Sequence, residues 1–379
     1  MRSYILTINK ALGRFYDSLL SFRYILQYKR LLRRNKLPIT CEDHYYEQYR
    51  KKWSILKKPK KVYYELFSRY CGNNIDIVPE DICHNIIEAV LNPPKYRALY
   101  EDKNYFDFFV GSENMPKTLL RCINGIFYDA CYNFIGKKDI EVTKYINSPN
   151  IVIKGTIETS SGIDVLFYEK SGNTYLEANG GGKILELSYI AERLKNNFII
   201  QERGRQSEFF STFCVSSINT IRLLTYRSVK DDKVHILNGA LRMGQLGKLK
   251  DNAHQGGKIV SIDINSGRLG NVVFDQYGND YKYHNGIDFS VNHFCIPYWD
   301  RVLEFAKQIG ESIKYHRLLN LDIMVDENNQ PKLIEYNISS MSVWIFQFCG
   351  SPAFSDFTDE IIEYCKENIH NIRSQYLYI

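Results

Sequence analysis

The sequence lacks the signatures of a disulfide-rich, zinc-binding or membrane-spanning protein. Its nine cysteines are odd in number and never occur as a Cys-x-x-Cys pair, which argues against both a disulfide framework and a zinc knuckle. No stretch approaches the roughly 20 uninterrupted apolar residues of a membrane span, and the N-terminus shows no apolar run followed by a small-residue cleavage site. These absences lead us to expect a cytoplasmic protein with reduced thiols.

Internal repeats and low-complexity tracts are missing as well, and the composition is that of a globular protein. Of the 379 residues, 44% are hydrophobic and 24% are charged, so the chain has enough apolar material for a sizeable core. A single hydrophobic core stops growing before this length is reached. We therefore expect more than one lobe, with a cleft between lobes as the natural place for a site.

Basic residues are concentrated at the N-terminus. Residues 1–61 hold sixteen Lys or Arg and four Asp or Glu, a local charge of +12, whereas the other 318 residues sum to −6. Apolar side chains recur there at helical spacing, for example at Phe15, Leu19, Phe22 and Leu26. This pattern suits a helix on the inner, anionic face of a membrane, and equally a helix packed on the body with a solvated basic face. No nucleic-acid-binding module follows, so we expect no nucleic-acid partner.

The rest of the chain divides into a helical part and a strand-rich part. Helical spacing extends from Tyr63 to Leu91, and Pro93 and Pro94 interrupt it. From Ile151 onward, short β-rich runs alternate with glycine-containing turns. The predicted strands are residues 151–154, 165–169, 198–202, 220–226, 235–243, 258–264, 321–325 and 332–336, and the predicted helices are 184–194, 299–313 and 359–369.

The most informative segment is LDIMVDENNQPKLIEYN, residues 321–337. Its turn residues predict a hairpin in which Asp322 lies directly opposite Glu335, with Asn337 two residues further along the same face. The same register pairs Met324 with Leu333. Two facing carboxylates repel each other unless a cation lies between them, and carboxylate and amide oxygens are what Mg²⁺ accepts. The alternative is a solvent-facing hairpin with ordinary surface charges.

Two further segments could handle phosphate groups. In residues 151–169 a strand ends at Lys154 and a Ser/Gly turn follows, which lets backbone amides approach phosphate oxygens, although such a turn is also typical of a simple hairpin. The Walker pattern GxxxxGK[ST] is absent. In residues 216–264, Arg222 and Arg242 could clamp a phosphoryl group, or they could form structural ion pairs with nearby acids.

A set of short motifs occurs in one order along the chain. They are Lys103 in YEDKNYF, Lys154 before ETSSGIDV, Gln201-Glu202 ending FIIQE, Arg222 in SINTIR, Arg242 and Asn252 in LRMG…KDNAHQGG, and Asp322…Glu335-x-Asn337. Together they resemble an ATP-grasp enzyme, and more narrowly the sugar-transfer-associated ATP-grasp family of polysaccharide biosynthesis. The resemblance covers roughly residues 75–350 and implies an α+β fold in which two lobes grip ATP.

The resemblance also implies a role for each matched residue. Lys103 and Lys154 would hold the nucleotide phosphates under a loop of Thr159, Ser160, Ser161 and Gly162. Gln201 and Glu202 would lie at the adenine, and Glu208 at the ribose. Asp322, Glu335 and Asn337 would bind Mg²⁺, in the form of two ions, while Arg222, Arg242 and Asn252 would act at the γ-phosphate and the acyl group.

We therefore expect an ATP-dependent carboxylate–amine ligase that works through an acyl phosphate and modifies a sugar acid or glycan. Its partners would be a carboxylate, an amine acceptor and, through residues 1–61, an anionic membrane. An ATP-grasp kinase acting on a sugar hydroxyl and a non-catalytic nucleotide-binding scaffold are the alternatives. The expected organisation is a basic, helical extension (1–75), a helical region before the grasp (76–150), a lid (151–205) and a catalytic subdomain (206–379).

Overall fold

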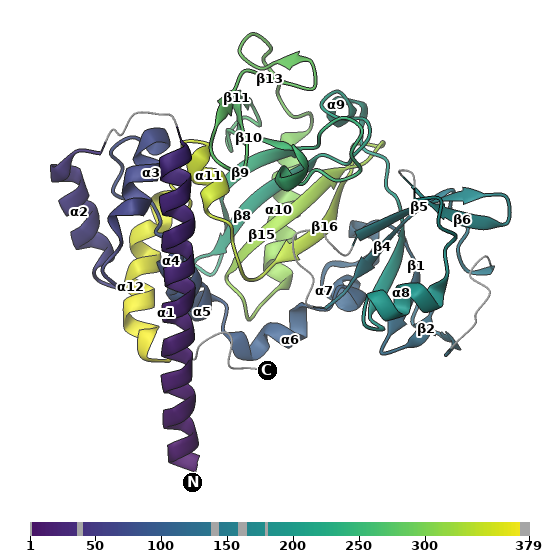
Figure 1. Cartoon of the computed structure of the whole chain (residues 1–379), viewed down its shortest axis with the longest axis horizontal. Helices are drawn as coiled ribbons and strands as arrows, with labels where there is room; N and C mark the ends of the chain where they lie inside the picture. Colours follow the sequence, from purple (N-terminus) through teal and green to yellow (C-terminus); the bar gives the residue numbers. More distant parts are fainter. Residues whose placement is uncertain (1, 36–40, 138–143, 158–164, 179–180, 372–379) are drawn as a thin grey trace.

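The computed structural model describes residues 2–35, 41–137, 144–157, 165–178 and 181–371. Within these ranges the chain forms a helical N-terminal part, a central sheet and a second sheet to one side of it (Figure 1). Helices and antiparallel sheets make up the described chain, so the α+β fold class is confirmed.

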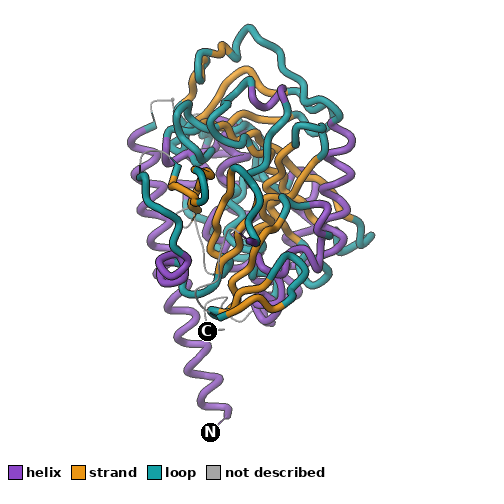
Figure 2. The backbone as a smooth tube through the Cα atoms, turned by 90° about the vertical axis from the view of Figure 1, so that its right-hand side faces the viewer, coloured by secondary structure: helices purple, strands orange, loops and turns teal. Residues whose placement is uncertain are grey.

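The N-terminal part is built around one long helix, α1 (Arg2–Arg34). The first half of α1 projects from the body in both views, and its second half packs against two shorter helices (Figures 1 and 2). Tyr28 is 2% exposed and contacts Tyr63 and Phe67 edge-on, which fixes the helix to the core. The other elements here are α2 (Asp43–Trp53), α3 (Lys61–Cys71), α4 (Glu80–Ile82), a π-helical turn (Cys83–Ile87) and α5 (Glu88–Leu91).

The first sheet has seven described strands in the order β3-β2-β1-β7-β4-β5-β6. One face packs against α8 (Leu187–Arg193), whose Ile190 is fully buried with strand residues such as Ile153 and Ile200. The strands are β1 (Thr118–Ile123), β2 (Ile126–Tyr128), β3 (Phe134–Gly136), β4 (Asn150–Gly155), β5 (Val165–Ser171), β6 (Thr174–Glu177) and β7 (Phe198–Glu202).

The helical expectation for residues 76–150 is wrong in its second half, because β1, β2 and β3 fall there. These strands join the first sheet through the pairing of β1 with β7. In the run TLLRCI, apolar and polar residues do not alternate as they do in a half-exposed strand, so the sequence contained no strand signal. In the structure, Leu119 to Cys122 are all buried. The first sheet is therefore larger than the lid expected over residues 151–205.

The second sheet has seven described strands in the order β12-β11-β10-β9-β8-β15-β16. Side chains of consecutive residues in these strands point to opposite faces of the sheet, and each face has its own hydrophobic core. Leu223 packs toward α10 (Trp299–Ser312), while Leu224 packs toward the N-terminal helices, α11 (Trp344–Phe348) and α12 (Thr358–Asn368). The strands are β8 (Thr220–Arg227), β9 (Val234–Met243), β10 (Lys258–Ile262), β11 (Leu269–Phe274), β12 (Asp280–Tyr281), β15 (Leu318–Val325) and β16 (Pro331–Asn337).

The hairpin of β15 and β16 has the predicted register at one end and a different one at the other. Asp322 pairs with Glu335 as expected. The expected pairing of Met324 with Leu333 is wrong, because a bulge after Asp322 pairs Leu333 with Ile323 instead. Ile323 and Leu333 are both fully buried in the core, so apolar burial stabilises the shifted register.

None of the described helices is both long enough and apolar enough to cross a membrane. Short elements complete the described chain. They are α6 (Arg97–Tyr100), α7 (Phe106–Val110), α9 (Glu208–Ser211), β13 (Tyr283–His284), β14 (Ile287–Asp288), and the 3₁₀ turns Pro94–Tyr96, Lys103–Tyr105, Ser112–Asn114, Ala253–Gln255, Ser355–Phe357 and Ile369–Asn371.

Candidate functional site

A cavity of about 840 Å³ is lined by residues of both sheets. It brings together residues that are far apart in the sequence, from Lys103 to Asn337. Of the predicted site residues, its lining includes Lys103, Lys154, Gln201, Glu202, Arg222, Arg242, Asn252, Asp322, Glu335 and Asn337.

Five predicted site residues are not part of this described lining. Glu208 begins α9 with an exposed side chain and is not among the residues that line the cavity, so its expected place at the ribose finds no support in the geometry. Thr159, Ser160, Ser161 and Gly162 lie outside the described residues. Their expected role as a phosphate-covering loop remains a prediction.

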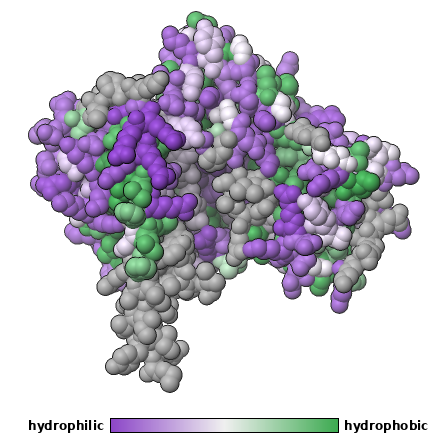
Figure 3. Space-filling model, viewed as in Figure 1, coloured by the Kyte–Doolittle hydropathy of each residue, from purple (hydrophilic) through white to green (hydrophobic). Residues whose placement is uncertain are grey.

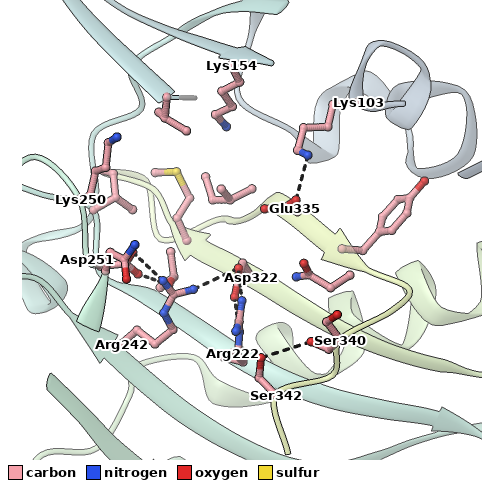
Figure 4. A pocket seen from close by; sticks show the side chains of 18 of the residues that line it. Lys103, Lys154, Arg222, Arg242, Lys250, Asp251, Asp322, Glu335, Ser340 and Ser342 are labelled. Carbon is pink, nitrogen blue, oxygen red and sulfur yellow. Dashed lines mark hydrogen bonds and ion pairs between the residues drawn. The ribbon is translucent and has the colours of Figure 1, made fainter. Parts of the chain in front are cut away.

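Asp322 is the most strongly bound carboxylate of the site (Figure 4). The Arg222 guanidinium donates to both of its oxygens, Nε to Oδ1 at 2.7 Å and Nη2 to Oδ2 at 2.6 Å, and Arg242 Nη1 adds a third bond at 3.2 Å. Burial alone would raise the pKa of Asp322, but the two guanidinium groups hold this pKa below its usual value. The strand register explains the contact, because Asp322 of β15 pairs with Arg222 of β8.

Glu335 has its own basic partner. Lys103 Nζ lies 2.9 Å from Glu335 Oε1, and this carboxylate is about a third exposed. Lys103 belongs to the turn after α6, and its backbone N–H donates to the Thr156 carbonyl next to β4. The ion pair therefore joins the neighbourhood of the first sheet to β16 of the second sheet.

These contacts correct one expectation. The facing carboxylates Asp322 and Glu335 were expected to need a cation between them, but arginine and lysine side chains neutralise each one separately. The structural ion-pair alternative for Arg222 and Arg242 is thus confirmed. Whether the two arginines also contact a phosphoryl group stays a prediction.

Lys154 differs from the other basic residues of the site. It ends β4 and points into the cavity toward Glu335 (Figure 4), and no hydrogen bond or ion pair joins its ammonium group to the described residues. Burial lowers the pKa of Lys154 to about 8, and the neighbouring Lys103 acts in the same direction. A cation held in this way favours the approach of an anion.

Asp251 is a site residue that the sequence analysis missed. It accepts a hydrogen bond from Arg242 Nη2 at 3.0 Å and another from the Thr220 hydroxyl. Burial raises the pKa of Asp251 despite the nearby guanidinium of Arg242. Its position directly before Asn252 was the available signal, but one acid in a polar loop is not distinctive.

Part of the cavity lining is apolar, and we call this part the apolar wall. It consists of Val152, Val165 and Phe167 of the first sheet and of Met324 and Ile334 of the second sheet. The bulge in β16 brings Ile334 and Glu335, which are consecutive residues, into the same lining. The cavity lining therefore combines apolar side chains of both sheets with the charged residues.

The loop after β16 forms another part of the lining and is held by a buried carboxylate. Glu88 of α5 is 2% exposed and accepts the backbone N–H groups of Ser340 at 2.8 Å and Met341 at 2.9 Å. Ser340 and Ser342 both have positive φ, at 55° and 51°, which are strained for serine. The buried acceptor stabilises a loop that its own sequence does not favour.

The oxygen donors suit a hard cation. Asp322, Glu335 and Asn337 offer two carboxylates and one amide carbonyl on one hairpin, and this donor set fits Mg²⁺ better than a softer metal. Among the described residues, no group of three or more His, Cys, Asp or Glu side chains forms a metal site by itself. Further oxygen ligands would therefore have to come from a bound substrate or from water.

Residues 85–361 match the family described as sugar-transfer associated ATP-grasp. A search of curated proteins found no match.

Among solved structures, similar ones include N5-carboxyaminoimidazole synthetase from Staphylococcus aureus complexed with ADP (10% identity, TM-score 0.38, 69% of this chain and 54% of that chain). Others are D-alanine-D-alanine ligase from Coxiella burnetii (9%, 0.38, 72% and 59%) and the biotin carboxylase domain of 2-oxoglutarate carboxylase from Hydrogenobacter thermophilus (12%, 0.41, 72% and 46%). The alignments thus span about half of each of those chains.

The two carboxylates should differ in their effect on stability. Asp322→Asn leaves the largely buried Arg222 guanidinium without its carboxylate and removes one of the two carboxylates that Arg242 binds, so we expect the free energy of unfolding to fall by about 3 kcal/mol. Glu335→Gln breaks a partly exposed pair and should cost less than about 1 kcal/mol. Urea denaturation followed by tryptophan fluorescence measures both.

Asp356→Asn is the matched control, because Asp356 is exposed and has no ion pair among the described residues. Its unfolding midpoint should equal that of the parent. Equal losses for Asp322→Asn and Glu335→Gln would contradict the assignment of Asp322 as the central, buried carboxylate.

Proposed function

The chain belongs to the sugar-transfer associated ATP-grasp family, and on that premise we propose that it is an ATP- and Mg²⁺-dependent carboxylate–amine ligase. One observation supports this proposal above all. Lys103, Lys154 and the oxygen donors of the β15–β16 hairpin meet in one cavity between two sheets, although they come from distant parts of the sequence. The substrate would be a sugar acid or a glycan carboxylate in polysaccharide biosynthesis, joined to an amine.

We place the nucleotide in the cavity between the sheets. The apolar wall of Phe167, Met324 and Ile334 suits a planar base, and Gln201 and Glu202 at the end of β7 lie in the same lining. Gln201 is 3% exposed, and its amide already donates to the Pro116 carbonyl at 3.2 Å, so its side chain serves to hold the strand end. Backbone groups at this strand end remain the candidates for reading the base.

The phosphates would then lie among the lysines and the oxygen donors. Lys154 forms no ion pair with a described acid, although Glu335 and Asp322 attract its charge, and Lys103 can exchange Glu335 for a phosphate oxygen. Asp322, Glu335 and Asn337 would hold Mg²⁺, in the form of two ions. When bound, Mg²⁺ neutralises charge on the β- and γ-phosphates.

The proposed reaction has two steps. A carboxylate oxygen of the acid forms a bond to the γ-phosphorus, and the bond from that phosphorus to the β-phosphate oxygen breaks, which gives an acyl phosphate and ADP. The amine nitrogen then bonds to the acyl carbon, the carbon–oxygen bond to phosphate breaks, and the nitrogen loses a proton. Arg222, Arg242 and Asn252 line the cavity where they can orient these groups.

An oxygen-isotope experiment tests the ligase reaction. We expect a panel of uronic acids labelled with ¹⁸O in the carboxylate, incubated with ATP, Mg²⁺ and an amine, to yield inorganic phosphate that carries one ¹⁸O atom. Hydroxylamine in place of the amine should trap the acyl phosphate as a hydroxamate. Mass spectrometry of the phosphate and of the hydroxamate measures both outcomes.

Two variants serve as references in this assay. Lys154→Met should lose most of the turnover, whereas Glu363→Gln, an exposed site on α12 away from the cavity, should keep it. A stable phosphorylated sugar with unlabelled phosphate would identify a kinase and refute the ligase. ADP binding without any turnover of the panel would favour a nucleotide-binding scaffold.

The pKa of Lys154 makes nucleotide binding depend on pH. A triphosphate or diphosphate favours the ammonium form, so binding raises a pKa that is about 8 in the free protein, and a proton is taken up above this pH. Affinity for Mg·ADP should therefore fall as pH rises through 8, by about tenfold per pH unit. Calorimetry in buffers of different ionisation enthalpy measures both the affinity and the proton uptake.

Lys154→Arg is the matched control, since a guanidinium stays charged throughout this range. Its affinity should be independent of pH between 7 and 9. If the parent shows no proton uptake at pH 8.5 while it still binds Mg·ADP, Lys154 does not contact the phosphates.

A further inference from the structure

The helix α1 has an inner face that belongs to the body of the protein. Tyr28 donates a hydrogen bond to the buried Glu80 carboxylate at 3.1 Å, and the Ser21 hydroxyl accepts from Lys57 at 2.9 Å and from Asn85 at 2.9 Å. Asn35, directly after the helix, is 8% exposed and also contacts this core. The second half of α1 is therefore a structural part of the fold.

The opposite face of α1 carries exposed apolar side chains. Phe15, Leu19, Phe22 and Leu26 are 64%, 52%, 59% and 39% exposed. At about 100° per residue, their spacing of four, three and four places them within roughly 60° of one another, on the side away from Tyr28. Figure 3 shows hydrophobic atoms along this helix beside strongly hydrophilic ones. We call these four residues the outer stripe.

Positive charge surrounds the outer stripe. Residues 2–34 contain eight Lys or Arg and a single acid, Asp17. The described basic side chains of α1 are all exposed, and they are Arg23, Lys29, Arg30, Arg33 and Arg34. A helix with a narrow apolar stripe and a dense positive charge is complementary to a surface that is both apolar and anionic.

We propose that the outer stripe and the basic residues of α1 dock the protein on an anionic lipid bilayer. The four apolar side chains enter the boundary between headgroups and acyl chains, while the lysines and arginines contact the lipid phosphates. A second copy of the chain suits this face less well, because pairing two such helices brings eight positive charges against eight. The projection of α1 from the body leaves its first half free to lie along a surface (Figures 1 and 2).

Docking also orients the cavity. Arg23 and Tyr24, which follow Phe22 of the outer stripe, line the cavity at its α1 end. One helix therefore carries both the lipid-binding stripe and part of the cavity rim. Because Tyr24 lies roughly opposite the outer stripe on the helix, docking places this end of the cavity on the side of α1 that faces away from the lipid.

Vesicle co-sedimentation of the full chain tests the proposal. We expect most of the protein to sediment with vesicles of equal parts phosphatidylglycerol and phosphatidylcholine, and little with phosphatidylcholine alone. Binding should weaken as NaCl rises from 0.1 M to 0.5 M, because the charges are then screened over a shorter distance. The double variant Leu19→Glu/Phe22→Glu should reduce the vesicle affinity at least tenfold.

The matched control is Val215→Glu/Val291→Glu, which makes the same charge change at two apolar side chains that are 74% and 68% exposed and lie outside α1. It should sediment like the parent. A second variant, Arg30→Gln/Arg33→Gln, keeps the outer stripe and should weaken binding only to the anionic vesicles. It also tests the proposal if the glutamate variant fails to fold.

Three results would overturn the proposal. The parent could bind neutral and anionic vesicles equally, or the outer-stripe variant could bind like the control. Sedimentation equilibrium without lipid could instead show a dimer for the parent and a monomer for Leu19→Glu/Phe22→Glu, which would make the stripe an interface between two copies. None of these results bears on the ligase, which the isotope experiment tests separately.

Discussion

The buried ion pairing of Asp322 organises the centre of the molecule. This carboxylate on β15 binds Arg222 of β8 and Arg242 of β9, so one residue joins three adjacent strands through their side chains. Asp251 extends the network on the other side of Arg242. Two arginines and two aspartates balance one another, which allows four charges to lie in the interior of a sheet at acceptable cost. The strand register of the second sheet is tied to the same contacts.

The remaining charges of the cavity lie outside this balanced cluster. Lys103 and Glu335 form a pair that links the region of the first sheet to the second, and Lys154 adds a positive charge that forms no ion pair with a described acid. A phosphate group that enters the cavity can therefore contact Lys103 and Lys154 without breaking the ion pairs of Asp322. The same network holds the hairpin whose oxygens would meet a metal ion, so under the proposed function Asp322 would serve both stability and metal binding.

The sequence predicted most of this arrangement where the signal was local. Runs such as FIIQE and LDIMV are short, β-branched and bounded by turns, and the pairing of Asp322 with Glu335 followed from the turn alone. The partners of these carboxylates were not predictable, because Arg222 and Lys103 come from distant segments and no periodic pattern records which strand lies beside which. Likewise, Leu119 to Cys122 are three apolar residues and one arginine without strand-like alternation, a pattern that fits a helix or a strand equally well.

The N-terminal helix α1 is a second case in which the sequence did not predict the contacts between distant segments. Its sequence left open whether the apolar residues pack on the body or face outward, and the structure places different residues on each side: Tyr28 is buried, whereas Phe15 and Phe22 are exposed. Packing on the body is therefore confirmed for the inner face, and membrane contact by the outer face stays a prediction. The sequence of α1 alone does not tell which of its faces is buried, because this depends on the side that α3 and α4 cover.

Anomalous diffraction from crystals grown with ADP and Mn²⁺ tests the central claim most directly. Our account predicts a manganese peak within coordination distance of Asp322, Glu335 and Asn337, next to the nucleotide phosphates, with Lys103 turned from Glu335 to a phosphate oxygen. The Asp322 contacts to Arg222 should persist in part, since the sheet depends on them. Nucleotide bound in the cavity with the metal elsewhere and the Lys103–Glu335 pair intact would contradict the account.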